Sequence, residues 1–399
     1  MRSQSFVLNS RHFLVFILVS YAVVVSPFVG AGLRNYMVLL AAMIGGILFM
    51  AFRFSLNRQV IWALLLFSIM TIQSLFQGGA GQFGSVALTL LYAVGYFAIA
   101  SLLDRVEDKR VFLMNVMRGV IFAFAILSVV QMVTSLAGLP VPNQIASKGL
   151  WSYNSLAIEP SQLGRIVGVS MLCYLMLSRL PGKTEQPRAR QKILTAFLAT
   201  MLLSGSGLAA VAILFVYGLS RSLPWFVLIV IVSILIWPMF LLFDFEHLQR
   251  FARLASSLGS LDLDQVLTAE HSGGVRLAPL LIYLRDGSMA EPGFWFGYGP
   301  EGVAHFFQGE ILGVSDDNIG AGFLPGFAVV YGGLTFAFFI WVFALRQANR
   351  TTMPMITFFT IFMTSSAWNT QVFWYGLIVI QIGWAASRDV ATPSRGALT

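Results

Sequence analysis

The stretch that decides the fold is residues 83–103, FGSVALTLLYAVGYFAIASLL, which contains no charged side chain. A helix of about 20 apolar residues is long enough to cross the hydrocarbon core of a bilayer. The rest of the chain has the same character, because 57% of its 399 residues are hydrophobic and only 11% are charged, with a mean hydropathy of +0.80. Soluble globular proteins carry charge on about a quarter of their residues. The composition therefore excludes a water-soluble globule and indicates an all-α polytopic membrane protein.

Comparable apolar runs recur along the chain and predict ten membrane-spanning helices. The runs lie near residues 13–30, 36–52, 60–76, 83–103, 119–139, 164–180, 225–243, 322–345, 354–370 and 371–387. The first run is expected to be a retained helix and not a cleaved signal peptide, because Gly30-Ala31-Gly32 is a weak cleavage site and further spans follow.

Residues 193–220 are apolar throughout but are interrupted by four small residues at 204–207, so they form either one kinked helix or two short helices joined at a tip. The distribution of Lys and Arg decides between these alternatives. With a hairpin, 18 of the 25 basic residues face the cytoplasm and 3 lie near short outer loops. With a single helix, 13 basic residues face the cytoplasm and 8 lie near short outer loops. The positive-inside rule therefore predicts the hairpin, about twelve transmembrane helices, and both termini in the cytoplasm.

This topology leaves two extracytoplasmic segments with room for chemistry, residues 140–163 and 244–321. The expected organisation is N-terminal transmembrane helices (1–243) with a hairpin tip at 204–207, an extracytoplasmic catalytic loop (244–321), and C-terminal transmembrane helices with a cytoplasmic tail (322–399). Of the 17 acidic residues, 12 are expected on the outer side.

Charge and cysteine content bear on other classes of function. The net charge of +8 comes from basic residues in small groups between apolar runs, which is typical of topology signals and not of nucleic-acid binding. The basic stretch 183–192 is expected to be a cytoplasmic loop that faces anionic lipid headgroups. The single cysteine, Cys173, permits no internal disulfide and no cysteine-based metal site. No motif calls for a metal or a cofactor.

The long outer loop carries most of the candidate site residues. Residues 244–257 predict an interfacial helix and residues 275–284 an apolar helix. The four arginines of the loop lie on or beside these helices: Arg250, Arg253, Arg276 and Arg285. Residues 291–302 are dense in Gly and aromatic residues and predict a turn-rich ribbon. Such a ribbon can line a sugar site, for which Trp295, Tyr298 and the nearby His305 are the candidates.

The order of residues in this region resembles the O-antigen ligase and Wzy-type polymerase superfamily, whose members carry an Arg, a helix, a Pro-x-x-Gly-x-Gly turn and a His-Asn pair, followed by a Gly-Leu-rich helix. The corresponding residues are Arg276, Pro292, Gly297-Tyr298-Gly299, Asp317-Asn318, Gly326 and Gly332-Gly333. Residues 203–207 are similar to the family's Thr-x-Ser-Arg motif, with Gly207 in place of its arginine. Glu159-Pro160-Ser161 is similar to a triplet in exopolysaccharide and capsule polymerases.

The resemblance implies a GT-C-like membrane glycosyltransferase of the bacterial inner membrane. Such a polymerase takes a growing glycan from its undecaprenyl diphosphate carrier and transfers it to a newly flipped lipid-linked repeat unit, which builds surface polysaccharide or exopolysaccharide. A chain-length regulator and a flippase are the protein partners that this pathway implies. The diphosphate leaving group needs cations, for which the four loop arginines and Arg165 are the candidates. A carboxylate, Asp317 first and Glu159 second, is expected to take the proton of the acceptor hydroxyl.

Each candidate also has an ordinary structural interpretation. Arg250 and Arg253 can reach headgroups from an interfacial helix. Arg165 can pair with Glu159, and Glu159 can belong to a turn that places a proline at the first position of a helix. Asp317 can cap the helix that follows it.

Two other functions stay open. A ligase would move finished glycan to a different acceptor, and Asp317 at the place of the ligase histidine argues against it. A transporter or flippase would place ionisable residues near the middle of the membrane. The middles of the predicted spans hold almost no charge, which favours the enzyme.

Overall fold

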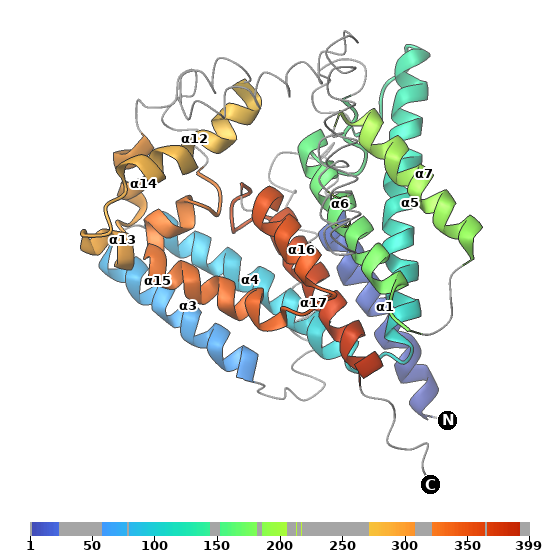
Figure 1. Ribbon diagram of the computed structural model, residues 1–399, viewed down its shortest axis with the longest axis horizontal. Helices are drawn as coiled ribbons and strands as arrows, with labels where there is room; N and C mark the ends of the chain where they lie inside the picture. Colours follow the sequence, from blue (N-terminus) through green and yellow to red (C-terminus); the bar gives the residue numbers. More distant parts are fainter. Residues whose placement is uncertain are drawn as a thin grey trace, which may run out of the picture.

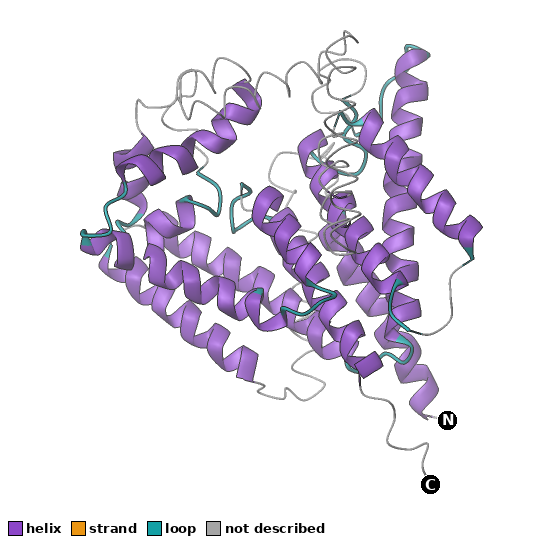
Figure 2. Cartoon of the chain, in the orientation of Figure 1, coloured by secondary structure: helices purple, strands orange, loops and turns teal. Residues whose placement is uncertain are grey.

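The computed structural model describes residues 2–23, 58–77, 80–143, 152–181, 186–205, 213, 217, 271–307, 321–363 and 365–391. Every regular element in these ranges is helical, and turns connect the helices (Figure 2). The α-helices are α1 (Arg2–Ala22), α3 (Arg58–Phe76), α4 (Ala80–Leu103), α5 (Lys109–Leu136), α6 (Pro160–Ser178), α7 (Pro187–Leu203), α12 (His271–Asp286), α13 (Pro292–Phe296), α14 (Pro300–Phe307), α15 (Gly326–Phe343), α16 (Met353–Phe358) and α17 (Gln371–Ala391). A 3₁₀ turn, η3 (Leu345–Gln347), follows α15, and a π-helical turn, η4 (Phe359–Met363), continues α16.

Several of these helices are long and apolar enough to cross a membrane. The segments that meet both conditions are Arg58–Phe76, Phe83–Leu103, Lys109–Leu136, Pro160–Ser178 and Gly326–Gln347. The described part of the chain is thus all-helical, and five of its helical segments have the length and composition of membrane spans. The predicted spans near 36–52 and 225–243 lie outside the described residues, so the count of twelve spans stays a prediction.

The observed helices differ from the predicted spans mainly at their ends. Helix α5 begins at Lys109, earlier than the predicted start near residue 119. In its first turn, Arg110 donates to the carbonyl oxygens of Leu177 (2.9 Å) and Pro181 (2.7 Å) and so ties the start of α5 to the end of α6. The span predicted at 354–370 is wrong at its end, because the helix stops at Met363 and the residues before α17 form a turn.

The described residues reach the start of the predicted hairpin tip, which itself stays a prediction. Helix α7 ends at Leu203, and Gly205 follows in the left-handed region with φ 65°. Glycine adopts this conformation without steric cost, which is why it commonly ends helices. Residues 206–212, where the second helix would begin, lie outside the described ranges.

Helix α6 lies at the centre of the bundle, between α5 and α17 (Figure 1). All of its residues at positions 166–177 are buried. By contrast, α3 leaves apolar side chains such as Ile61, Leu64 and Leu75 exposed. This exposure is expected of a helix whose outer face contacts lipid instead of water.

A buried polar network fixes several helices in register. Tyr96 of α4 donates to Gln381 of α17 at 2.9 Å, and Gln59 of α3 donates to the Tyr96 hydroxyl at 3.0 Å. Gln347, just after α15, donates to both Tyr96 and Gln381. Because unpaired polar groups are costly in an apolar interior, this network specifies how the four segments pack.

The ends of the helices define two sides of the bundle. Helix α1 begins and α17 ends at the lower side of Figure 1, whereas α6 begins and α12–α14 lie toward the opposite side. The candidate site residues described below belong to this second side.

Candidate functional site

Glu159 and Pro160 start helix α6. Pro160 occupies a first-turn position and Glu159 is the N-cap residue, with an extended backbone at φ −130° and ψ 150°. The exposed Glu159 carboxylate accepts a hydrogen bond from the Ser161 hydroxyl at 3.2 Å. The structure agrees with the helix-start interpretation of Pro160, and the Glu159 side chain is exposed.

The segment before Glu159 is held firmly against α5. The Asn154 side chain donates to the carbonyl oxygens of Asn143 (2.8 Å) and Ala157 (2.6 Å), and the Ser155 hydroxyl donates to Phe124 of α5 (2.7 Å). These side chains are buried. The approach to α6 is therefore a fixed structure that determines where Glu159 lies.

Arg165 lies about one and a half turns further into α6 and joins distant parts of the chain. Its half-buried guanidinium donates to the hydroxyls of Ser366 and, at 2.8 Å, Ser365, both in the turn between α16 and α17. The carbonyl oxygen of Ser366 accepts a hydrogen bond from the backbone N–H of Phe323 at 2.8 Å. The two neutral hydroxyls orient the guanidinium between α6 and the turn before α17.

A second assembly forms where residues 297–299 dock on α15. The backbone N–H groups of Tyr298 and Gly299 donate to the carbonyl oxygens of Val329 (2.8 Å) and Val330 (3.2 Å). The predicted ribbon is wrong in detail, because it consists of the short helices α13 and α14 joined at this point. Each helix begins with a proline, a residue that suits the first helical position.

Helix α15 is broken at Gly332, which has φ 84° and ψ 160°. The break frees backbone groups for the docking described above. Gln73 of α3 donates to the carbonyl oxygens of Tyr331 and Phe296, each at 3.0 Å, and so binds both sides of the contact. Backbone groups at a helix break in an apolar region need such partners.

Glycine is required at two positions of this contact. A Cβ atom at Gly297 would overlap the Val330 carbonyl oxygen, and one at Gly332 would overlap the Trp295 carbonyl oxygen. Two features that carried the resemblance, Gly297-Tyr298-Gly299 and Gly332-Gly333, are thus in direct contact. Close approach of the backbone explains these glycines without any chemistry.

The predicted sugar-binding aromatics have different surroundings. Trp295 is 40% exposed and donates its indole N–H to Met289 at 2.9 Å, and its neighbour Phe296 is 61% exposed. Tyr298 instead packs edge-on against Phe306 at 5.0 Å. Trp295 and Phe296 therefore offer the accessible aromatic surface, and Phe296 is a residue that the sequence analysis did not single out.

The hydroxyl of Tyr298 donates to the Glu291 carboxylate at 2.7 Å. Burial raises the pKa of Tyr298 well above its ordinary value, and the hydrogen bond and negative charge of Glu291 raise this pKa further. Tyr298 thus ties the start of α13 to the turn after it, which is a positioning role.

The predicted diphosphate ligands of the loop are only partly described. Arg285, in the last turn of α12, is exposed and forms two 2.7 Å contacts with the carboxylate of the adjacent Asp286. The hydrogen bond from Arg285 lowers the pKa of Asp286 below its ordinary value. Arg276 lies near the start of α12 and His305 on α14, but their side chains are outside the described set. Arg250, Arg253 and Asp317 lie outside the described residues altogether.

The partners of Arg165 and of the docked segment are not among the residues predicted from the sequence. Ser365 and Ser366 were counted within an apolar span, although two adjacent serines in such a run are a signal of a break. Gln73 was likewise counted within a span. Its amide group, in an otherwise apolar stretch, was the available signal of a polar contact.

Within the described ranges, no three His, Cys, Asp or Glu side chains come together in a way that could hold a metal ion. The thiol of Cys173 is buried inside α6.

Comparisons of the chain with protein-family models, with curated proteins and with solved structures find no match.

Proposed function

We propose that the protein polymerises lipid-linked oligosaccharide repeat units by glycosyl transfer at the outer face of the bacterial inner membrane. The donor is a glycan on an undecaprenyl diphosphate carrier. The observation that supports this most is the site around Arg165. There, a guanidinium oriented by Ser365 and Ser366 lies on the same helix as the exposed carboxylate of Glu159, at the side of the bundle where α6 begins.

The chemistry needs a cation and a proton acceptor. The anomeric carbon–oxygen bond to the diphosphate breaks, and the acceptor hydroxyl oxygen forms the new glycosidic bond. Arg165 stabilises the negative charge that builds up on the departing diphosphate. Arg276 and Arg285 of α12 are the further cations that we assign to it, with Arg250 and Arg253 earlier in the same loop. Asp317, or Glu159 in its place, accepts the proton of the acceptor hydroxyl.

The docked segment provides the sugar-binding surface in this proposal. Trp295 and Phe296 are exposed and adjacent, and aromatic rings bind the apolar faces of sugar rings by stacking. Gln73 and the contact between Gly297 and Gly332 hold these rings in place beside α15. This support favours an enzyme with a fixed binding surface.

The lipid-linked glycans of a strain that lacks the protein test the proposal. A missing polymerase leaves single repeat units attached to their final acceptor, and the wild-type gene restores polymer. Full-length polymer that stays on the carrier lipid would identify a ligase instead. Repeat units that accumulate only on the cytoplasmic face would identify a flippase.

A further inference from the structure

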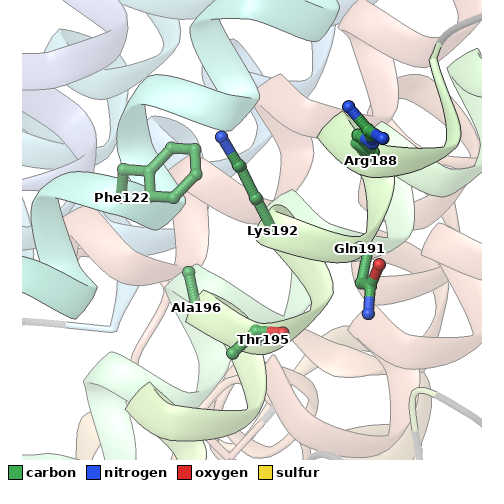
Figure 3. A pocket seen from close by; sticks show the side chains of 6 residues that line it. All are labelled: Phe122, Arg188, Gln191, Lys192, Thr195 and Ala196. Atoms are coloured by element: carbon green, nitrogen blue, oxygen red, sulfur yellow. The ribbon is translucent and has the colours of Figure 1, made fainter.

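A groove lies between the first turns of α7 and the middle of α5. Its volume is about 660 Å³, and it is lined by Phe122, Arg188, Gln191, Lys192, Thr195 and Ala196 (Figure 3). Only Phe122 comes from α5, and the other five residues come from α7. None of these residues belongs to the site around Arg165.

The lining changes character along α7. Arg188 and Lys192 are one turn apart on the same face of the helix, and both are exposed. Ala196 lies one further turn into the helix, and Figure 3 shows the Lys192 side chain extending toward the side on which Phe122 lies. From Arg188 to Ala196 the helix rises about 12 Å. The groove is therefore cationic at the helix start and apolar deeper in, as a phospholipid requires.

The start of α7 already favours an anion. The first turn contains no acidic residue, and the N-cap residue Gln186 makes no side-chain capping hydrogen bond. The N-terminal end of a helix carries partial positive charge, so Arg188 and Lys192 add to that charge instead of compensating it. A bound phosphate group would offset the partial charge of the helix end and the charges of Arg188 and Lys192.

We propose that this groove binds an anionic phospholipid from the cytoplasmic leaflet. Arg188 and Lys192 hold its phosphate, Gln191 and Thr195 hydrogen-bond the glycerol ester groups, and Phe122 and Ala196 contact the acyl chain. The topology predicted from the charge distribution puts the start of α7 at the cytoplasmic surface, where anionic lipids attract basic side chains. This site is independent of the proposed polymerase reaction.

Native mass spectrometry of the full-length protein in detergent tests the site, with dioleoyl phosphatidylglycerol and dioleoyl phosphatidylcholine added at equal concentrations. The wild-type protein is expected to bind phosphatidylglycerol more tightly. The exposed pair Arg188→Gln/Lys192→Gln should weaken that binding by about tenfold or more, since each basic side chain near the surface contributes to it. The matched control Arg58→Gln/Arg350→Gln removes the same charge from exposed positions outside the groove and should bind as the wild type does.

Several outcomes overturn the proposal. These are equal binding of the two lipids by the wild type, an equal loss in the control pair, or competition by free glycerol 3-phosphate at the concentration at which phosphatidylglycerol competes. The last result would indicate a site for a soluble phosphate. Phe122→Ala provides a second test, because it should weaken phosphatidylglycerol binding while both arginine and lysine remain. If Phe122→Ala binds phosphatidylglycerol as tightly as the wild type does, Phe122 does not contact the acyl chain and the proposed binding mode is wrong.

Discussion

Arg165 is the residue on which the proposed chemistry depends most. Its guanidinium donates to two serine hydroxyls from two different nitrogens, and the single nitrogen of a Lys ammonium does not reproduce this fixed planar geometry. We expect Arg165→Ala to lower polymer synthesis by about 30-fold or more, because removing one partner of a hydrogen-bonded charge costs about 2–5 kcal/mol. Arg165→Lys should lose less, but still most of the activity. Lipid-linked glycan length in a complemented deletion strain measures both.

Protein abundance in the membrane separates catalysis from folding in this experiment. Ser365→Ala keeps Ser366 as a partner of Arg165 and should retain much of the activity. Wild-type polymer from Arg165→Ala at normal abundance would show that Arg165 does not bind the diphosphate.

Tyr298 provides a prediction about pH. Its pKa is raised on folding above the ordinary value of 10.0, so its contribution to stability is complete below about pH 10 and is lost as the pH rises beyond that value. Tyr298→Phe removes the hydrogen bond to Glu291 and should lower stability by about 1 kcal/mol at neutral pH. Thermal unfolding in detergent should show a difference between the two proteins at pH 8 that shrinks toward pH 11. A difference that grows with pH would contradict this role.

At the residue scale, structure that depends on adjacent residues can be predicted from the sequence, and contacts between distant residues cannot. The helix start at Glu159-Pro160 follows from residues that are adjacent in sequence. The partners of Arg165 lie 200 and 201 positions away, and no pattern in one sequence pairs residues over such a separation. The diphosphate-binding role of every site arginine stays a prediction, and the structure describes the side-chain contacts of Arg165 and Arg285.

At the scale of single elements, the break in α15 is the feature that positions the docked segment. Gly332 has a backbone conformation that other residues rarely adopt, and a Cβ there would overlap Trp295. Gly332→Ala should therefore lower the free energy of unfolding by about 1–3 kcal/mol from backbone strain alone. A lower unfolding temperature in detergent would report this loss.

Gly119 of α5 is the matched control for that substitution. A Cβ at Gly119 would meet no heavy atom within 4 Å outside its own helix and chain neighbours. Gly119→Ala should therefore leave stability unchanged or raise it by up to about 1 kcal/mol. Equal effects of the two substitutions would show that the break at Gly332 is not needed.

The elements show why hydropathy predicts spans better than their interruptions. The run at 322–345 was predicted as one span, and its helix is broken at Gly332, which hydropathy cannot detect because glycine is nearly neutral. The span predicted at 354–370 includes Ser365 and Ser366, whose hydroxyls bind Arg165. Apolar length determines that a segment enters the membrane, and specific contacts determine where its helix stops.

For the whole molecule, charge and length together predict the topology. We expect reporter fusions after Arg221 to lie in the cytoplasm and fusions within residues 255–270 to lie on the outer side. Alkaline phosphatase, which is active only outside the cytoplasm, should be active when fused near Gly259. A stably expressed but inactive fusion at that position would place the loop arginines on the wrong side for the proposed reaction.

The overall character of the fold was predictable because the bilayer restricts a spanning chain to few structures. The apolar runs near 60–76, 83–103 and 164–180 each coincide with an observed helix. The docking of residues 297–299 on α15 was not predictable, since it depends on the close approach of Gly297 and Gly332 and on Gln73 from a third helix.

Reconstitution of the purified protein in liposomes tests the proposed polymerisation most directly. The liposomes are supplied with undecaprenyl diphosphate-linked repeat units, and glycan length and released undecaprenyl diphosphate are measured together, for the wild type and for Arg165→Ala. We predict longer lipid-linked glycans and the release of one carrier diphosphate for each new bond. Folded wild-type protein that leaves the repeat units unchanged, or that releases carrier without lengthening the glycan, would contradict the proposed function.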